Sequence, residues 1–238
     1  MPIQAHIQTR LSLDMIEEDS DYSYELLRQT HVEECAKLIS EAFVDNEPLA
    51  FYSKMTKEEF YDYIHPLIKS LLEEQLSFIV FDKQTNQIVS CLLSGDLYLQ
   101  HQHTSYYEDD DPVTDLLAEL DERFLVEFQK TNKFKEKTIL HVYYGATKQD
   151  FCGKGIGIKL RQCVCKYARK MYGFQYVIVE TSHPATTHIY TKKLIGGKIF
   201  TSIDPSTWLW KKNQTYPFKD YSSGPIPLIV ITLNDSTI

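Results

Sequence analysis

The 238-residue sequence lacks long apolar runs, a basic surplus and paired cysteine motifs. No stretch approaches the roughly 18 apolar residues of a membrane-spanning helix, so no membrane partner is expected. The 25 Lys and Arg are outnumbered by 33 Asp and Glu, which argues against a general nucleic-acid binder. The five cysteines form no Cys-x-x-Cys pair, so neither a metal site nor a disulfide framework is predicted. With no signal-peptide pattern, this composition predicts a cytoplasmic protein with reduced thiols.

The apolar residues that are present, 43% of the chain, suffice for one ordinary core. Residues 1–21 are polar and aperiodic and are predicted to be an N-terminal arm, followed by a single domain at 22–238. Strands are expected at 22–28, 77–81, 88–98, 138–147, 175–181, 198–203 and 226–233. Helices are expected after capping boxes at 30–33 and 56–59, and over 113–130, 154–172 and 185–193. The mixture without strict alternation predicts an α+β fold, a mixed sheet with helices on both faces.

The most informative segment is the glycine-rich stretch at 151–160, which joins a β-branched strand to a helix. Gly153, Gly155 and Gly157 alternate there, and glycine permits positive φ and close backbone approach. Free N–H groups beside a helix N-terminus form an anion site, for which a diphosphate is the natural guest. The dinucleotide and Walker A patterns are both absent. A tight turn without any ligand is the alternative interpretation.

Cys152-x-x-Gly155-x-Gly157 resembles motif A of the Gcn5-related N-acetyltransferases, Gln/Arg-x-x-Gly-x-Gly/Ala. Cys152 departs from that pattern and removes one side-chain donor to the diphosphate, and Lys154 would supply part of the lost charge. The segment 45–49, Asp-Asn-Glu-Pro-Leu, resembles a signature of the arylalkylamine N-acetyltransferases of the invertebrate type.

The resemblance implies a central, mostly antiparallel sheet of about seven strands, in which two splayed parallel strands form a cleft for acetyl-CoA. It implies direct acetyl transfer to the primary amine of a small arylalkylamine- or polyamine-like molecule, by a monomer or homodimer and without a metal. The residues implied in acetyl-CoA binding are Gly145, Ala146, Thr147, Cys152, Gly153, Lys154, Gly155, Ile156, Gly157 and Ile158.

Three residues are the implied catalytic candidates. Glu47 would be the base, acting through a water, and a surface glutamate at a helix end is the ordinary alternative. His141 is the rival base, because the vertebrate-type enzymes carry two strand histidines at the positions of His141 and Tyr143, and because the pKa of histidine suits proton transfer near neutrality. Tyr190 would protonate the leaving thiolate, unless it is a core tyrosine.

Ser182 and Thr186 are the implied substrate-pocket residues. If their segment is helical, a spacing of four places them on one face; helix capping by Ser182 is the alternative. Tyr143 is the third candidate, because strand alternation predicts one shared face for His141, Tyr143, Gly145 and Thr147.

Two other functions stay open. Cys152 and the single strand histidine are compatible with an inactive binding or scaffold protein that kept the fold. A protein acetyltransferase acting on lysine or N-termini is the third possibility.

Overall fold

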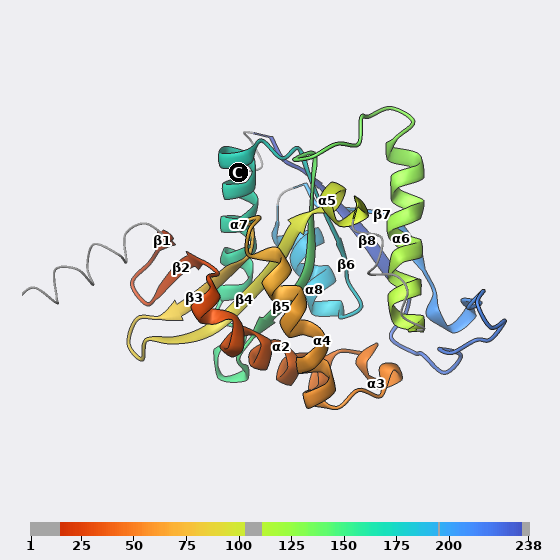
Figure 1. Ribbon diagram of the computed structural model, residues 1–238, viewed down its shortest axis with the longest axis horizontal. Coiled ribbons are helices and arrows are strands. Elements are labelled where there is room, and N and C mark those ends of the chain that lie inside the picture. The colour runs from red at the N-terminus through yellow and green to blue at the C-terminus, as the bar shows by residue number, and fades with distance from the viewer. Residues whose placement is uncertain (1–14, 103–110, 195, 235–238) are drawn as a thin grey trace, which may run out of the picture.

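The computed structural model describes residues 15–102, 111–194 and 196–234, in which eight strands form one sheet (Figure 1). Along the chain they are β1 (Met15–Glu18), β2 (Tyr22–Leu26), β3 (Phe78–Asp82), β4 (Gln87–Asp96), β5 (Ile139–Thr147), β6 (Tyr176–Glu180), β7 (Lys198–Ile203) and β8 (Ile226–Thr232). In space the order is β1-β2-β3-β4-β5-β6-β8-β7. Neighbours are antiparallel except β5 and β6, which are parallel. The predicted mixed, mostly antiparallel sheet is confirmed.

The eighth strand, β1, lies where the sequence predicted an arm. Met15–Glu18 pairs with β2 at the sheet edge, and Glu18, its last residue, forms an ion pair with Lys83 at 2.5 Å. Four residues with two glutamates are too few to show a two-residue hydrophobic period, so the pattern could not reveal the strand. Residues 1–14 of the predicted arm lie outside the described residues.

Helices cover both faces of the sheet, as predicted. α2 (Val32–Asn46), α4 (Lys57–Leu71) and α6 (Pro112–Phe128) pack on one face, and α7 (Ile156–Tyr167) packs on the other (Figure 1). Shorter helices are α3 (Ala50–Ser53), α5 (Leu97–Gln102) and α8 (Pro184–His188). π-Helical turns follow α7 and α8, at Ala168–Tyr172 and Ile189–Lys193. No helix of the described residues is both long enough and apolar enough to cross a bilayer.

The two predicted capping boxes have different outcomes. At α4 the box forms, with the Glu59 N–H donating to Thr56 Oγ1 at 3.1 Å and the Thr56 N–H to Glu59 Oε2 at 2.8 Å. At α2 it does not, because the helix begins at Val32 without a side-chain capping bond. The Glu33 carboxylate instead contacts two α4 side chains, including His65 at 2.9 Å. Tertiary packing thus replaced the local cap.

A β-bulge in β5 resets which way its side chains point. Leu93 of β4 lies opposite Tyr144 and Ser94 opposite Val142, so Tyr143 is the extra residue. The predicted common face is therefore wrong. His141 points toward α6, whereas a Cβ on Gly145 would meet the α7 side chain of Arg161.

β5 and β6 separate soon after they pair. Ile139, Leu140 and His141 lie opposite Tyr176, Val177 and Ile178, and the ladder then stops. Within the described sheet, Val142 and residues 144–147 of β5 pair only with β4. The predicted splay of two parallel strands is therefore present and begins after His141.

Candidate active site

Glu47 lies at the C-terminal end of α2, the helix that packs against β3, β4 and β5. It is the residue after the helix end; its N–H bonds the carbonyl of Phe43, and Pro48 stops the helix as predicted. The Ser182 hydroxyl donates to Glu47 Oε1 although the two residues are 135 positions apart. Burial raises the pKa of Glu47, while the bonds from Ser182 and the Leu49 N–H hold it down. A half-buried carboxylate with a raised pKa is suited to accept a proton near neutrality.

The charge of this carboxylate acts on two tyrosine side chains. Burial raises the pKa of Tyr221 to about 12, and the charge on Glu47 adds to that shift. The pKa of Tyr144 is raised by burial and also by Glu47. Tyr144 packs edge-on against Phe43, with ring centroids 4.9 Å apart. Glu47 is therefore half-buried and near enough to both tyrosines for its charge to act on them.

Of the two predicted hydroxyl residues, Ser182 contacts Glu47 in the structure and Thr186 does not. Ser182 precedes α8, which is capped by His183, so Ser182 and Thr186 do not share a helix face and Ser182 is not the cap. No described contact places the Thr186 hydroxyl on Glu47. The neighbouring Thr187 instead bonds Thr181 at 2.8 Å. The premise for pairing Ser182 with Thr186 was wrong because the chain is extended at His183, whose φ is −92° and ψ 126°.

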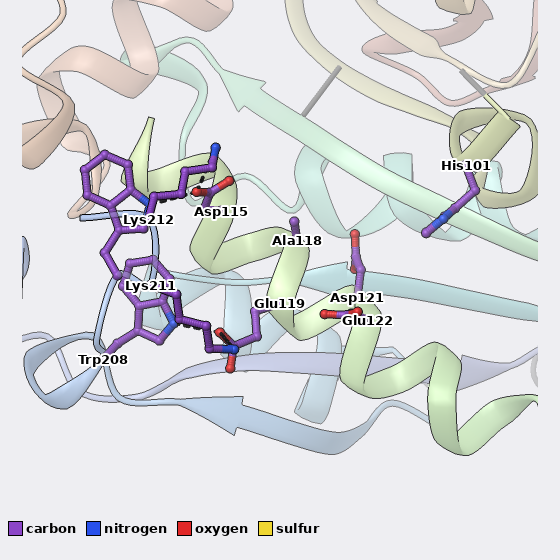
Figure 2. A pocket seen from close by; sticks show the side chains of 10 residues that line it. His101, Asp115, Ala118, Glu119, Asp121, Glu122, Trp208, Lys211 and Lys212 are labelled. Atoms are coloured by element: carbon purple, nitrogen blue, oxygen red, sulfur yellow. Dashed lines mark hydrogen bonds and ion pairs between the residues drawn. The ribbon is translucent and has the colours of Figure 1, made fainter. Parts of the chain in front are cut away.

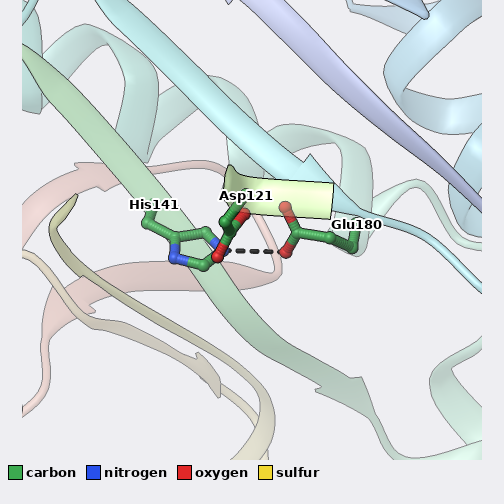
Figure 3. A group of neighbouring side chains, drawn as sticks. All are labelled: Asp121, His141 and Glu180. Carbon is green, nitrogen blue, oxygen red and sulfur yellow. Dashed lines mark hydrogen bonds and ion pairs between the residues drawn. The ribbon is translucent and has the colours of Figure 1, made fainter. Parts of the chain in front are cut away.

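His141 belongs to a buried acidic cluster that the sequence did not reveal. Its Nε2 lies 2.8 Å from Glu180 Oε2 at the end of β6, and Asp121 of α6 points at both (Figure 3). Asp121 Oδ1 and Glu180 Oε1 have no hydrogen-bond partner among the described residues. The ring of Tyr143 packs on that of His141 at 4.2 Å.

Burial dominates the electrostatics of this cluster. It raises the pKa of Glu180 to about 7 and holds that of Asp121 well above its ordinary value, with the charge of Glu180 adding to the shift. It lowers the pKa of His141, against the attraction of Asp121. The three ligand atoms lie within 4.8 Å of one another, a spacing that could hold a metal ion. Protons on the carboxyl groups would also neutralise the cluster, so the geometry does not require a metal.

Tyr190 lies on the opposite face of the sheet, in the π-helical turn after α8. Its side chain is buried, and its hydroxyl makes no hydrogen bond of ordinary geometry to the described residues. Burial raises the pKa of Tyr190, while the nearby charge of Arg161 lowers it. The hydroxyl is therefore protonated at neutral pH and retains a proton to donate.

The glycine-rich segment forms the predicted strand–turn–helix. Gly153 and Gly155 adopt φ of 77° and 81°, and Gly155 caps α7 without a side-chain bond. The N–H groups of residues 153–157 have no acceptor among the described residues. Cys152 is exposed, with weak contacts from Sγ to the carbonyls of Thr147 and Lys148 at 3.7 and 3.6 Å. Lys154 lies over the Phe151 ring at 4.6 Å instead of over the turn.

A separate groove of about 370 Å³ lies between α6 and the loop that carries Trp208 and Trp210 (Figure 2). Two of its carboxylates are already paired: Asp115 accepts from Trp210 Nε1 at 2.7 Å, and Glu119 from Trp208 Nε1 at 3.1 Å. Lys212 and Lys211 lie 3.1 and 3.5 Å from the same two groups. Neither Glu47 nor Tyr190 lines this groove, but Asp121 does, so the groove borders the cluster around His141.

Sequence reasoning missed three buried polar residues of the site region. Asp121 and Glu180 are 59 positions apart, and neither shows a local motif. Arg161 did leave a signal, because it shares the helix stripe of Gly157, Leu160 and Val164, where a charge is unexpected. An arginine on a buried stripe is the pattern that could have identified it.

No family model and no curated protein matches the sequence. Solved structures do match the fold. Arylalkylamine N-acetyltransferase 2 from Aedes aegypti is 16% identical, with a TM-score of 0.74, over 90% of this chain and 99% of that one. The C-terminal condensation domain of Ebony, in complex with β-alanyl-dopamine, is 16% identical with a TM-score of 0.73, over 89% and 98%. A Drosophila melanogaster polyamine N-acetyltransferase is 14% identical with a TM-score of 0.70, over 90% and 100%.

Proposed function

The protein has the fold of the Gcn5-related N-acetyltransferases, and from that premise we propose that it transfers the acetyl group of acetyl-CoA to the primary amine of a small molecule. The acceptor class is an arylalkylamine or a polyamine. At 13–16% identity the amine transferases among the structural neighbours support this proposal through their fold only.

The observation that carries the proposal is the edge of β5 beside which the ladder with β6 has ended. Val142 and residues 144–147 pair with β4 and have no β6 partner in the described sheet, so another chain could pair with them on that side. That edge runs from His141 to the amide-rich turn at 153–157. An amide-containing chain such as pantetheine could extend along it as a strand partner would.

The residues of the turn also fit a diphosphate. Five successive N–H groups without acceptors, beside the positive end of α7, form a site for a doubly charged group. Because these are backbone groups, Cys152 removes one side-chain donor but leaves this set intact. Gly145, Ala146 and Thr147 would hold the pantetheine, and residues 152–158 the diphosphate.

Glu47 and Tyr190 would each carry out one of the two proton transfers. The amine nitrogen attacks the acetyl carbon, the carbon–sulfur bond breaks, and its electron pair goes to sulfur. Glu47, bonded to Ser182, takes the amine proton directly or through one water. Tyr190 gives its hydroxyl proton to the thiolate. Glu47 is preferred to His141 as the base, because burial raises the pKa of Glu47 but lowers that of His141.

The test is turnover with a panel of amines. The protein is incubated with acetyl-CoA and either arylalkylamines such as tyramine or polyamines such as agmatine, and released thiol is titrated. We expect thiol release that depends on one of these amines. Absence of turnover with every amine, despite tight acetyl-CoA binding, would contradict the proposal.

Two measurements separate the alternatives. Calorimetry that detects no heat at millimolar CoA would favour a binding or scaffold protein. Peptides with free lysine or N-terminal amines, offered in competition with small amines, would reveal a protein acetyltransferase by preferential peptide acetylation.

The turn itself yields a prediction with a matched control. Gly155→Ala should cost about 1–2 kcal/mol of folding stability, because the φ of 81° suits glycine, although an added Cβ would meet no atom within 4 Å. It should also weaken CoA binding at least tenfold by shifting the amides. Gly173→Ala, at φ 79° with equally open surroundings, should cost similar stability and leave CoA affinity unchanged. Denaturant unfolding and calorimetry measure both effects; equal CoA affinities in the two variants would refute a role for the turn.

A further inference from the structure

Arg161 is a buried cation for which the described residues supply no anion. Its side chain lies on α7 and is only 8% exposed. Nη1 donates to the carbonyl of Gly157 at 2.8 Å, and Nε has no hydrogen-bond partner among the described residues. No carboxylate among the described residues forms an ion pair with the Arg161 guanidinium. Because a guanidinium loses its hydration on burial, such an arrangement is costly unless an anion binds there at some stage.

Arg161 is surrounded by residues that the sequence predicted for catalysis or acetyl-CoA binding. Cζ lies 5.2 Å from the centroid of the Tyr190 ring. A Cβ on Gly145 would come within 2.9 Å of Nη2, and one on Gly157 within 3.2 Å of Nη1. The guanidinium therefore lies between β5, the first turn of α7 and Tyr190, and glycine at both positions leaves room for it.

The position of Arg161 favours the thiolate of CoA over its diphosphate as the anion that binds there. The diphosphate turn is exposed at residues 152–155, whereas Arg161 is buried beside the tyrosine that would protonate sulfur. The charge of Arg161 acts on the buried thiol of Cys165, but burial raises the pKa of that thiol to about 12, so it supplies no negative charge near neutrality. Besides burial, the charge of Glu180 acts on Tyr190 and raises its pKa. The anion that belongs at this place is the one formed by the reaction, a thiolate.

We propose that Arg161 stabilises the negative charge that develops on the CoA sulfur, and on Tyr190 after it has given its proton to that sulfur. This inference rests on the proposed acetyl transfer. When the carbon–sulfur bond breaks, its electron pair goes to sulfur, the Tyr190 proton follows, and the phenolate regains a proton from solvent. The fixed positive charge lowers the barrier because the charge it opposes exists only after attack has begun.

The test compares Arg161→Met, which removes the charge at similar length, with Arg161→Lys, which keeps it. We expect Arg161→Met to bind acetyl-CoA within threefold of wild type and to transfer acetyl about 10²–10³-fold more slowly in a single turnover. Arg161→Lys should recover at least tenfold of that loss. Equal rates in wild type and Arg161→Met would overturn the inference while leaving the acetyltransferase function intact.

A spectroscopic titration distinguishes thiolate stabilisation by Arg161 from a purely structural role of this residue. The thiolate absorbance of bound CoA, with the desulfo-CoA complex subtracted to remove tyrosine and cysteine signals, should show a bound thiol that ionises at lower pH than free CoA. Arg161→Met should abolish that shift. A wild-type complex whose thiol titrates like free CoA would overturn the inference even if Arg161→Met fails to fold. Loss of CoA binding in a folded Arg161→Met would also overturn it, by assigning the charge to the diphosphate. Wild-type protein that binds no CoA would instead refute the proposed function.

Discussion

Replacing Glu47 with glutamine should lower the turnover number about 10²–10⁴-fold, the usual contribution of a general base. The amide keeps the size of the side chain and its bond to Ser182 but cannot accept the amine proton. CoA affinity should not change, because the diphosphate turn at 153–157 is made of backbone groups. Steady-state kinetics with the best amine of the panel and calorimetry with CoA measure the two quantities.

Glu41→Gln is the matched control, since Glu41 is an exposed glutamate on the same helix. It should retain wild-type turnover. The acidic limb of the wild-type pH–rate profile should lie above the ordinary glutamate range, because burial raises the pKa of Glu47. Ser182→Ala removes a bond that lowers this pKa, so the limb should move to higher pH. An unchanged rate in Glu47→Gln would transfer the role of base to His141.

Glu180→Gln should make the protein more stable than wild type above neutral pH, by about 3.5 kcal/mol at most. Burial raises the pKa of Glu180 from 4.5 to about 7, and one pKa unit corresponds to about 1.4 kcal/mol. Between these two values the unfolded chain has released the proton that the folded protein still holds. The Glu180 contribution to the free energy of unfolding therefore falls as pH rises from about 4.5 to about 7 and is constant above.

Urea unfolding at pH 5, 6, 7 and 8 would measure this difference. The two proteins should have similar stability near pH 5 and diverge toward pH 8, because glutamine has no proton to lose. Glu73→Gln, at an exposed position, should follow the wild-type curve throughout. Parallel curves for wild type and Glu180→Gln would mean that Glu180 ionises normally and that the cluster is not desolvated.

The predicted strands after residue 21 and the main helices are present because their signals are local. The Thr56–Glu59 box, the proline after Glu47 and the β-branched runs each act within a few residues. Where a distant group competed, the local prediction failed. The α2 box gave way to contacts with α4, and β1 is too short to have a pattern.

In the candidate site, too, the locally determined features were predicted correctly and those that depend on distant residues were not. The glycine spacing at 153–157 determined a turn with positive φ and a helix behind it, because only the residues within that turn decide its backbone. The alternation rule failed in β5, since a bulge at Tyr143 depends on pairing with β4. It turned Gly145 toward α7, away from the face of His141.

The sequence by itself determined the α+β class, the order of the main elements and the amide-rich turn, because these follow from periodicity and backbone preference over short spans. Only the tertiary structure decided that Ser182 meets Glu47, that Asp121 and Glu180 enclose His141, and that Arg161 lies against Tyr190. These contacts join residues from separate elements, and their burial, which sets the charges, exists only once those elements have packed.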